Sequence, residues 1–366
     1  MAKKGKIARP MSLLSKIFAY PTLAVNLVIG VLLTVSAYCS LLPPVGEWPL
    51  LSLSGLAFPF LFAANLAFLL LWLVTTRKFA ILPLIFLAVT SLPAFHYCPV
   101  HTGKTKMEPD FKFMSYNTQG FGTANFNDYS SKNQVLQYSC SMGADIICYQ
   151  EAVVTIVTDR AKEDKRISAL YPYCAAEKSS GLACLSKYPI LNYDIVDFEG
   201  AVANKCMILK ILAGNDTITI FNCHFQSNHL NPSDFEAAHQ DDAIIAGSKR
   251  VLRKLLNSTS RRAKQAETIA EMAKNTNGTV IVAGDFNDSP LSYVHRLFDR
   301  YLTDCYATAG TGIGYSYNKH HLYYRIDHVF CSKELRPVSC RIDRGCKLSD
   351  HYPILTEFAK SEKANR

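Results

Sequence analysis

The sequence predicts an α/β domain with mixed β-sheet, preceded by a bundle of about three transmembrane helices. Three observations predict this organisation. The first hundred residues hold three long apolar stretches, and the remainder alternates short β-branched or aromatic runs with helical patterns. Two of those runs are joined by a turn short enough for a hairpin, which argues against a purely parallel sheet. We therefore divide the chain into a membrane anchor, residues 1–100, and a C-terminal domain, residues 101–366.

The apolar stretches run from about 21 to 42, from 50 to 74 and from 79 to 95. The first two exceed the roughly 20 residues that an α-helix needs to span a bilayer, and the third lies at the lower limit of about 17. The second stretch is apolar on every side, which a surface helix of a soluble domain is not. Trp48 and Trp72 flank it as interfacial anchors would.

The distribution of Lys and Arg predicts the orientation of these helices. The segment before the first stretch carries five basic residues, the loop at 43–48 none and the turn at 75–78 two. Positive segments stay in the cytoplasm. We expect a multi-pass protein of the cell (inner) membrane with its amino end inside and its C-terminal domain outside the cytoplasm. If the third stretch does not cross, the domain is cytoplasmic instead.

The positive charge belongs mostly to the membrane part. The chain carries a formal charge of +9, and residues 1–100 hold seven basic residues against one acid. The remainder is nearly balanced, so it lacks the strong positive field typical of a nucleic-acid-binding surface.

The most basic segment of the C-terminal domain is a helical pattern that could contact phosphates or anionic lipids. We interpret it as a solvated helix face, with Leu252, Leu255 and Leu256 on its buried side. Its cations are Lys249, Arg250, Arg253, Lys254, Arg261, Arg262 and Lys264.

Eight apolar runs of the C-terminal domain predict strands, and an Ala-Gly-Asn-Asp turn joins two of them as a hairpin. The predicted strands are 111–116, 145–149, 182–185, 207–212, 217–222, 279–283, 326–331 and 352–358. The main helical patterns are 133–142, 235–256 and 260–274.

The twelve cysteines show no CxxC pair and no zinc spacing. We interpret Cys148 and Cys223, which lie in predicted strands, as buried thiols. Cys340 and Cys346 could form a disulfide across a short loop, but their spacing alone does not fix the geometry.

Six polar islands carry groups that bind a metal ion or handle a phosphate, and most follow the end of a predicted strand. They are 115–117 (Ser-Tyr-Asn), 149–151 (Tyr-Gln-Glu), 222–224 (Asn-Cys-His), 284–287 (Gly-Asp-Phe-Asn), 325–328 (Arg-Ile-Asp-His) and 349–351 (Ser-Asp-His). Strand ends deliver side chains to the rim of a sheet, where they can converge.

In this order the islands resemble the motifs of the endonuclease/exonuclease/phosphatase superfamily, over roughly residues 108–360. The resemblance implies a four-layer sandwich of two mixed β-sheets flanked by helices. It also implies hydrolysis of phosphoesters with a divalent cation, Mg²⁺ or alternatively Mn²⁺, and no other cofactor.

The resemblance assigns the metal to three residues. Glu151 matches the metal-binding glutamate, Asn117 supports the ion or its waters, and Asp350 faces the metal directly or through water. Mg²⁺ takes one or two carboxylates and keeps several waters, which fits this set. The plain alternatives are a solvated glutamate and an asparagine that merely ends a strand.

The same resemblance assigns five catalytic residues. Asp285 orients or deprotonates the attacking water, and Asn287 donates to phosphate oxygens, although an Asp-x-Asn sequence also forms simple Asx turns. Asp327 holds His351, which stabilises the developing charge. His224 is the second histidine that faces the phosphate. Some members of the family pair this histidine with an upstream acid, which the segment 181–185 lacks.

We therefore expect a membrane-anchored, metal-dependent phosphoesterase in which water attacks phosphorus in line. Its expected partners are a phosphoester substrate, either a lipid head group or a nucleic acid, and the lipid bilayer. No protein partner is implied. The alternatives are a nuclease acting outside the cytoplasm and a catalytically silent phosphoester-binding protein. A transporter subunit is disfavoured because the three stretches contain no Asp, Glu, Lys or Arg.

Overall fold

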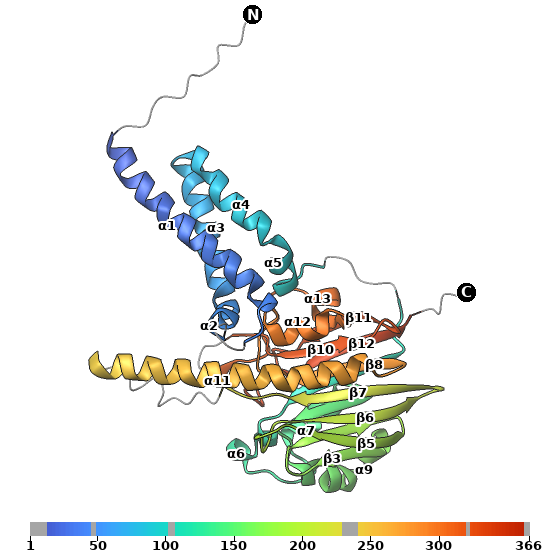
Figure 1. Ribbon diagram of the computed structural model, residues 1–366. Coiled ribbons are helices and arrows are strands. Elements are labelled where there is room, and N and C mark those ends of the chain that lie inside the picture. The colour runs from blue at the N-terminus through green and yellow to red at the C-terminus, as the bar shows by residue number, and fades with distance from the viewer. Residues whose placement is uncertain (1–12, 45–48, 102–106, 229–240, 320–322, 362–366) are drawn as a thin grey trace, which may run out of the picture.

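The protein consists of a helical bundle that stands on a domain built from two β-sheets (Figure 1). The computed structural model describes residues 13–44, 49–101, 107–228, 241–319 and 323–361. We call residues 13–101 the helical bundle and residues 107–361 the two-sheet domain.

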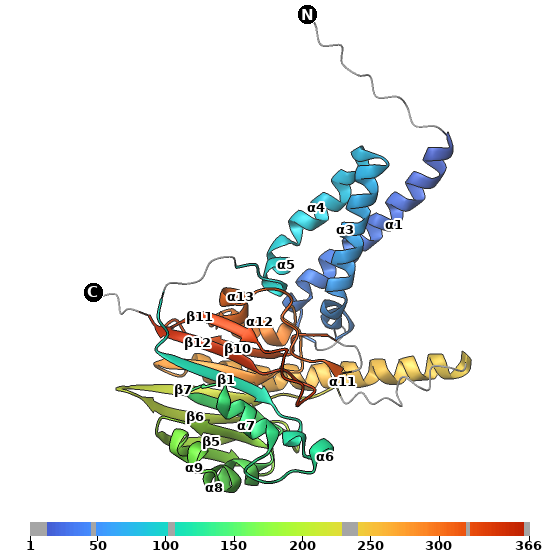
Figure 2. The ribbon, with the colours of Figure 1, turned by 180° about the vertical axis from the view of Figure 1, so that it is seen from behind.

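The bundle consists of three long helical segments that pack side by side, with short turns at their ends (Figures 1 and 2). The long segments are α1 (Leu13–Tyr38), α3 (Phe58–Val74) and the pair α4 (Ile81–Val89) and α5 (Ser91–Tyr97). The short elements are η1 (Cys39–Leu41), α2 (Pro49–Ser52), η2 (Leu53–Ala57) and η3 (Arg77–Ala80).

Two helices of the described chain, Ile17–Leu41 and Leu50–Val74, are long and apolar enough to cross a membrane. The third apolar stretch is a bent pair, Arg77–Val89 and Ser91–Tyr97, with an angle of 57° at the break. Length and composition therefore allow two spans, or three if the bent pair is one span.

A buried polar contact joins the three segments of the bundle. Asn26 of α1 donates to Asn65 of α3 at 3.1 Å, and Asn65 donates to the carbonyl oxygen of Pro83 at 3.1 Å. Trp72 donates its indole N–H to Asn26 at 3.1 Å and is 3% exposed. The prediction that Trp72 is an interfacial anchor is therefore wrong, because its polar edge is needed inside the bundle. Trp48 lies outside the described residues.

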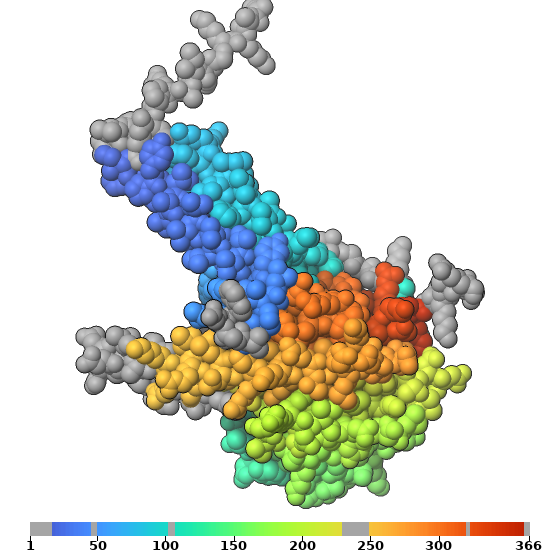
Figure 3. Space-filling model, in the orientation of Figure 1, coloured from blue at the N-terminus to red at the C-terminus, as the bar shows by residue number. Residues whose placement is uncertain are grey.

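The two ends of the bundle have different neighbours. At one end, Trp72 packs in a cluster with Ala19. At the other end, Leu33 and Tyr97 form a cluster with Leu291 of the two-sheet domain. The start of α1 therefore lies at the far end of the bundle, and the two-sheet domain lies at the near end. Figure 3 shows the bundle seated on the segments coloured yellow and orange, which belong to that domain.

The two-sheet domain contains two six-stranded mixed sheets, each with one parallel pair near its centre. The first sheet has the order β11 (Leu335–Ile342), β12 (Ile354–Lys360), β1 (Phe111–Asn117), β2 (Ile146–Gln150), β4 (Leu182–Ser186) and β3 (Tyr173–Glu177). The second has the order β5 (Ile190–Asp197), β6 (Lys205–Ala213), β7 (Asp216–His224), β8 (Thr279–Asp285), β10 (Asp327–Cys331) and β9 (Thr303–Asp304).

Apolar side chains of the inner faces, such as Phe113 and Ile220, form one core between the sheets. Helices cover both outer faces, so the expected four-layer sandwich is confirmed (Figures 1 and 2). The first sheet is covered by α7 (Gln134–Ser141), α8 (Ala161–Glu163) and α9 (Lys165–Leu170), and the second by α11 (Asp241–Lys274) and α12 (Tyr293–Asp299). The short elements η4 (Gly120–Gly122), α6 (Thr123–Phe126), η5 (Ile156–Arg160) and α13 (Cys305–Ala309) lie in the connections.

All eight predicted strands are present within two residues of their expected ends, and the hairpin is confirmed by the pairing of Ala213 with Asp216. The prediction of two helices between 235 and 274 is wrong in one respect. A single helix, α11, runs through Asn257 to Ser260 without a break, and 235–240 lies outside the described residues.

The interpretation of α11 as having a solvated basic face needs a correction. Arg262 is 1% exposed, and it binds Asp288 at 3.1 Å and the carbonyl oxygen of Gln226 at 2.6 Å. Leu252, expected on the buried side, is 38% exposed. The long α11 extends past the edge of the sheet it covers, so its first half has no sheet to pack against (Figure 1).

All twelve cysteines are free thiols, so the possible pairing of Cys340 with Cys346 is not formed. Each of the two sulfur atoms has its own partner. Cys340 contacts the hydroxyl of Thr356 at 3.4 Å, and Cys346 contacts the hydroxyl of Tyr116 at 3.3 Å. Cys148 and Cys223 are fully buried, as expected.

Candidate active site

Strand register brings the polar islands to one rim of the two sheets. In the second sheet, His224 at the end of β7 pairs with Asp285 at the end of the parallel β8. Asp327, at the start of the antiparallel β10, pairs with the same Asp285. In the first sheet, Asn117 ends β1 beside β2, and Glu151 follows β2 directly. Five residues from distant parts of the chain therefore meet.

The backbone around Asp285 is shaped by its neighbours. Gly284 has φ 135°, and a Cβ there would lie 2.0 Å from the carbonyl oxygen of Cys223 on the adjacent strand. Asn287 has φ 52° and donates its backbone N–H to Asp285 at 2.8 Å. This turn fixes the buried Asp285 carboxylate at the rim. The side-chain amide of Asn287 donates to the carbonyl oxygen of Phe225 at 3.0 Å.

Two carboxylates form the oxygen-rich part of the site. The amide of Asn117 donates to Glu151 at 3.2 Å and to Asp285 at 3.0 Å, so it links them. The Nε2 atom of His224 lies 3.7 Å from Glu151 and 3.9 Å from Asp285. One donor atom from each of Glu151, His224 and Asp285 lies within 4.8 Å of the others. Glu151, with φ 50° and a side chain 43% exposed, is open to solvent.

This donor set fits a hard divalent cation. Mg²⁺ binds proteins through one or two carboxylates and keeps several waters, and it accepts phosphate oxygens. The buried Asp285 and the accessible Glu151 supply the carboxylates. The solvent-exposed side of Glu151 leaves room for the waters and for a phosphate oxygen.

A second group of donors lies beside the first. His351 bonds through Nδ1 to Asp327 at 2.8 Å, and its Nε2 atom lies 3.8 Å from Asp285. Asp327 therefore orients the ring so that its other nitrogen faces Asp285. The ring of Tyr317 packs edge-on against that of His351, with 5.1 Å between ring centroids.

The charges in this group shift its protonation equilibria. Burial alone would lower the pKa of His351, but the negative charges of Asp327 and Asp285 raise it to about 10. Burial raises the pKa of Asp285; the charge of His351 opposes that shift and the charge of Asp327 adds to it. His351 is thus an imidazolium at neutral pH in the metal-free protein, placed beside the carboxylate that faces the donor set.

Asp350 lies at the margin of the site. Its carboxylate accepts from Gln119 at 2.8 Å and faces the ammonium of Lys319 at 3.4 Å. Ser349 before it donates to the carbonyl oxygen of Asn117 at 2.8 Å, which ties the last island to the first.

His224 has one nitrogen in the site and one outside it. Its Nδ1 atom is buried and has no hydrogen-bond partner among the described residues, which agrees with the absence of an upstream acid in the sequence. Glu177, the nearest acid along that part of the chain, binds the backbone N–H groups of Ser179 and Ser180 instead.

The sequence did not identify several residues that shape the site. Gln119 has φ 46°, and Lys319 and Tyr317 come from a segment without a strand or helix pattern. Gln150, fully buried beside the predicted Glu151, donates to Asn222 of the other sheet at 2.6 Å and so locks the two rims together. Gln150 and Asn222 both lie at or near the end of a predicted strand, which could have suggested this pairing. Gln119, Tyr317 and Lys319 carry no local signal.

The Arg-Ile-Asp-His island divides between two places. Asp327 enters the site, whereas His328 points to the opposite face and contacts the carbonyl oxygen of Asp288 at 2.9 Å. Arg325 donates to the carbonyl oxygen of His96 in the helical bundle at 3.1 Å. His229, His320 and His321 lie outside the described residues.

Comparison with known proteins agrees with this geometry. The model of the Endonuclease/Exonuclease/phosphatase family matches residues 114–351, and that of a domain of unknown function, DUF8431, matches residues 15–97. No curated protein matches the chain.

Several solved structures resemble the two-sheet domain. Humanized D. rerio TDP2 carrying 14 mutations has 16% identity and a TM-score of 0.50, and covers 68% of this chain and 99% of its own. D. rerio TDP2 complexed with single strand DNA product has 16% identity, a TM-score of 0.49 and coverage of 68% and 99%. The human Nocturnin catalytic domain with bound sulfate anion has 14% identity, a TM-score of 0.48 and coverage of 69% and 94%.

At such identities a structural likeness supports the fold alone. The family match is of a different kind, because it spans the islands from β1 to His351 and more than half of the chain. Together with the two-sheet sandwich and the acidic and histidine groups at its rim, it shows that the chain belongs to the endonuclease/exonuclease/phosphatase family.

Proposed function

We propose that the protein is a membrane-anchored, Mg²⁺-dependent phosphoesterase that hydrolyses a phosphodiester or phosphomonoester by in-line attack of water. One observation carries this proposal: Glu151, His224, Asp285 and the Asp327–His351 pair converge on one rim. Members of this family are typically hydrolases of phosphoester bonds, and this chain carries acidic and histidine groups at the corresponding rim.

Each side chain has a role that its position supports. A Mg²⁺ ion held by Glu151, with Asn117 and Asp350 at its margins, would polarise the phosphoryl group. Asp285 accepts the proton of the attacking water, and Asn287 holds the turn that positions it. His351, kept charged by Asp327, and His224 donate hydrogen bonds to the phosphoryl oxygens as negative charge develops.

The contacts between the two parts of the protein favour a substrate at the bilayer surface. Leu291, which follows the Asp285 turn, packs against the bundle, and Tyr324 donates to the carbonyl oxygen of Leu56 at 3.3 Å. The segment that carries Tyr317 pairs with His351 and reaches Tyr324 through backbone bonds. The loops at the site therefore rest on the bundle, so we propose a lipid head group as the substrate in preference to a nucleic acid.

A substrate panel tests the proposal. Full-length protein in detergent is assayed with Mg²⁺ or with EDTA on phospholipid vesicles, sphingolipid vesicles, soluble phosphomonoesters, duplex DNA and single-stranded DNA. We expect hydrolysis of a lipid phosphodiester with Mg²⁺ and loss of activity with EDTA. Preferential cleavage of DNA would instead identify a nuclease.

Matched variants separate the site from general damage. Glu151→Gln and Asp285→Asn should each reduce kcat/KM by about 100-fold or more, because each removes a group that acts on the reacting atoms. The controls Glu163→Gln and Asp194→Asn, which lie at exposed positions, should hydrolyse at the wild-type rate. Binding of phosphoesters without turnover, unchanged by Glu151→Gln, would identify a silent binding protein.

A further inference from the structure

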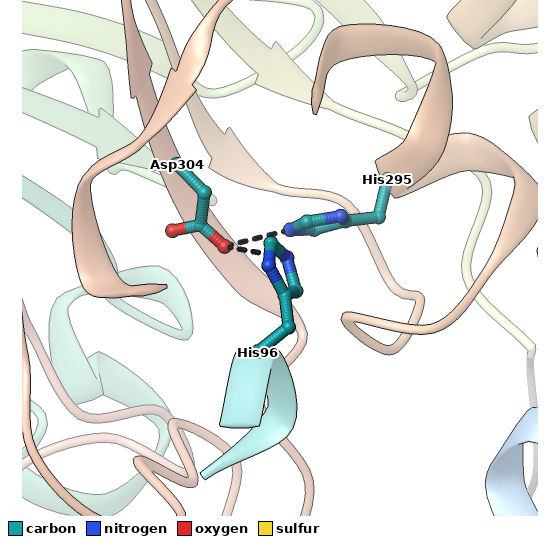
Figure 4. A group of neighbouring side chains, drawn as sticks. All are labelled: His96, His295 and Asp304. Atoms are coloured by element: carbon teal, nitrogen blue, oxygen red, sulfur yellow. Dashed lines mark hydrogen bonds and ion pairs between the residues drawn. The ribbon is translucent and has the colours of Figure 1, made fainter. Parts of the chain in front are cut away.

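Three donors outside the candidate active site meet where the helical bundle joins the two-sheet domain (Figure 4). His96 comes from α5 at the end of the bundle, His295 from α12, and Asp304 from the end of β9. The two rings and the carboxylate point toward one another. Nothing in the proposed hydrolysis uses these residues.

The spacing of the donor atoms suits a small metal ion. Asp304 Oδ2 lies 2.9 Å from His295 Nε2 and 3.4 Å from His96 Nε2, and the three atoms lie within 4.8 Å of one another. Zinc–ligand bonds of about 2.0–2.2 Å place the donors of a tetrahedral site roughly 3.3 Å apart. The two imidazole rings stand at 84° to each other, with 5.1 Å between their centroids.

The hydrogen bonds available within the cluster leave one donor atom unsatisfied. His295 forms a hydrogen bond through Nε2 to Asp304 Oδ2 at 2.9 Å. His96 Nε2 is buried and forms no hydrogen bond of adequate geometry with the described residues, although it lies near the same oxygen. A buried imidazole nitrogen without a well-formed hydrogen bond is costly, and a metal ion between it and the carboxylate would satisfy it.

Each of the three residues is held in place by further contacts. The other oxygen of Asp304 accepts the backbone N–H groups of Tyr306 at 2.7 Å and Ala307 at 3.0 Å, which fixes the carboxylate. His295 sits in the first turn of α12, where the cap Ser292 binds its backbone N–H at 3.1 Å. Such outer contacts are what hold metal ligands in position.

A hollow of about 270 Å³ opens beside the cluster and is partly lined by His96 and Asp304. It provides an entry path and room for water as a fourth ligand. Arg325 brings one positive charge to the region, stacked over the ring of Tyr306 at 4.5 Å. Asp299 also lines the hollow. The two carboxylates of Asp299 and Asp304 therefore outweigh the single positive charge of Arg325.

We propose that His96, His295 and Asp304 bind one Zn²⁺ ion, with water from the hollow as fourth ligand, and that this ion joins the bundle to the two-sheet domain. Two imidazoles and one carboxylate favour Zn²⁺ over Mg²⁺, which prefers an oxygen-only shell. The ion would tie α5 to α12 and β9, elements that are far apart in the sequence.

Metal content tests this proposal without reference to hydrolysis. Full-length protein in detergent is stripped with a chelator, reloaded with Zn²⁺ in excess Mg²⁺, desalted and measured by elemental analysis. We expect about one Zn²⁺ per chain in the wild type and in Glu151→Gln, and almost none in His96→Ala. The control is His101→Ala. His101 follows α5 in the chain and contacts the carbonyl oxygen of Gly310, so this variant should retain the ion.

Cobalt gives a second readout. Co²⁺ in a tetrahedral nitrogen and oxygen site absorbs strongly in the visible range, whereas an octahedral oxygen site absorbs weakly. The strong bands should appear in the wild type and disappear in His96→Ala and in Asp304→Asn, which can keep the helix cap through its amide oxygen. If either variant fails to fold by circular dichroism, the other decides. Equal Zn²⁺ in wild type and His96→Ala, or none in the wild type, would overturn the proposal.

Discussion

At the scale of single residues, the site depends on a few side chains whose charge is set by burial. His351 and Asp327 are both almost fully buried, so each is the main compensation for the charge of the other. The pKa of His351 is raised to about 10 in the folded protein from an ordinary value of 6.5. The pair therefore stabilises the fold fully below about pH 6.5, and this stabilisation is lost as the pH rises through about 10.

Asp327→Asn should return the pKa of His351 toward its ordinary value, because the variant removes its closest negative charge. In the metal-free protein, imidazole NMR signals of His351 should then titrate several units lower than in the wild type. The same variant should reduce kcat by about 100-fold, since a neutral ring stabilises negative charge less well.

Asp194→Asn, at an exposed position of β5, serves as control and should change neither the titration nor the rate. A wild-type His351 that titrates near 6.5 would show that Asp327 does not hold its charge. If Asp327→Asn lowers the pKa of His351 but leaves the rate unchanged, the charge of His351 does not contribute to the rate of hydrolysis.

At the scale of elements, the strands that carry the site could be predicted and the edge strands could not. The central strands β1, β2, β7 and β8 are buried apolar runs that end in polar residues, which is a strong local signal. The missed strands are irregular or exposed. Most of β5 is solvent-exposed, β3 is rich in alanine, and β11 contains Pro337 with a bulge beside it. Their pairing comes from neighbours, not from their own pattern.

The approach of β8 to β7 depends on a residue without a side chain. Gly284→Ala should unfold the two-sheet domain or lower its stability by about 4 kcal/mol or more, because its Cβ would lie 2.0 Å from the carbonyl oxygen of Cys223. The measurement is the thermal unfolding midpoint of full-length protein, with hydrolysis as a second readout.

Gly143→Ala is the matched control. Gly143 also has a positive φ, 71°, but a Cβ added there would meet no atom of the described residues within 4 Å. The substitution should cost only about 1–2 kcal/mol from backbone strain. Equal effects of the two substitutions would mean that strain, and not the contact with β7, determines the need for glycine at 284.

At the scale of the whole molecule, the sequence predicted the two parts but not how they meet. The islands that form the candidate active site share a strand-end signal, whereas His96, His295 and Asp304 share none. Each of the three would ordinarily be interpreted as a helix or strand-end residue. His295 and Asp304 bond to each other within the two-sheet domain, and the seating of the bundle on that domain brings His96 to them. The same holds for Arg262, whose buried bond to Asp288 arises from the packing of α11.

The arrangement of the bundle leads to a prediction about orientation. The start of α1 and the turn with Arg77 and Lys78 lie at the end of the bundle far from the two-sheet domain, and that domain contacts the near end. If the bundle crosses the membrane and its basic end stays in the cytoplasm, the two-sheet domain lies on the opposite side. We therefore expect a protease added to cells with a permeable outer envelope to digest a tag fused after residue 366.

The positions of the charges provide the control for this experiment. Replacing Arg77 and Lys78 by Gln removes positive charge from the turn, and adding two Lys residues near residue 44 places it at the opposite end of the bundle. The combined variant should leave part of the tag protected, because the bias that fixes the orientation then weakens. Complete protection of the tag in the wild type would place the two-sheet domain in the cytoplasm. Because that domain contacts the end of the bundle opposite to the basic end, the result would also mean that the bundle either crosses the membrane with its basic end outside the cytoplasm or does not cross it.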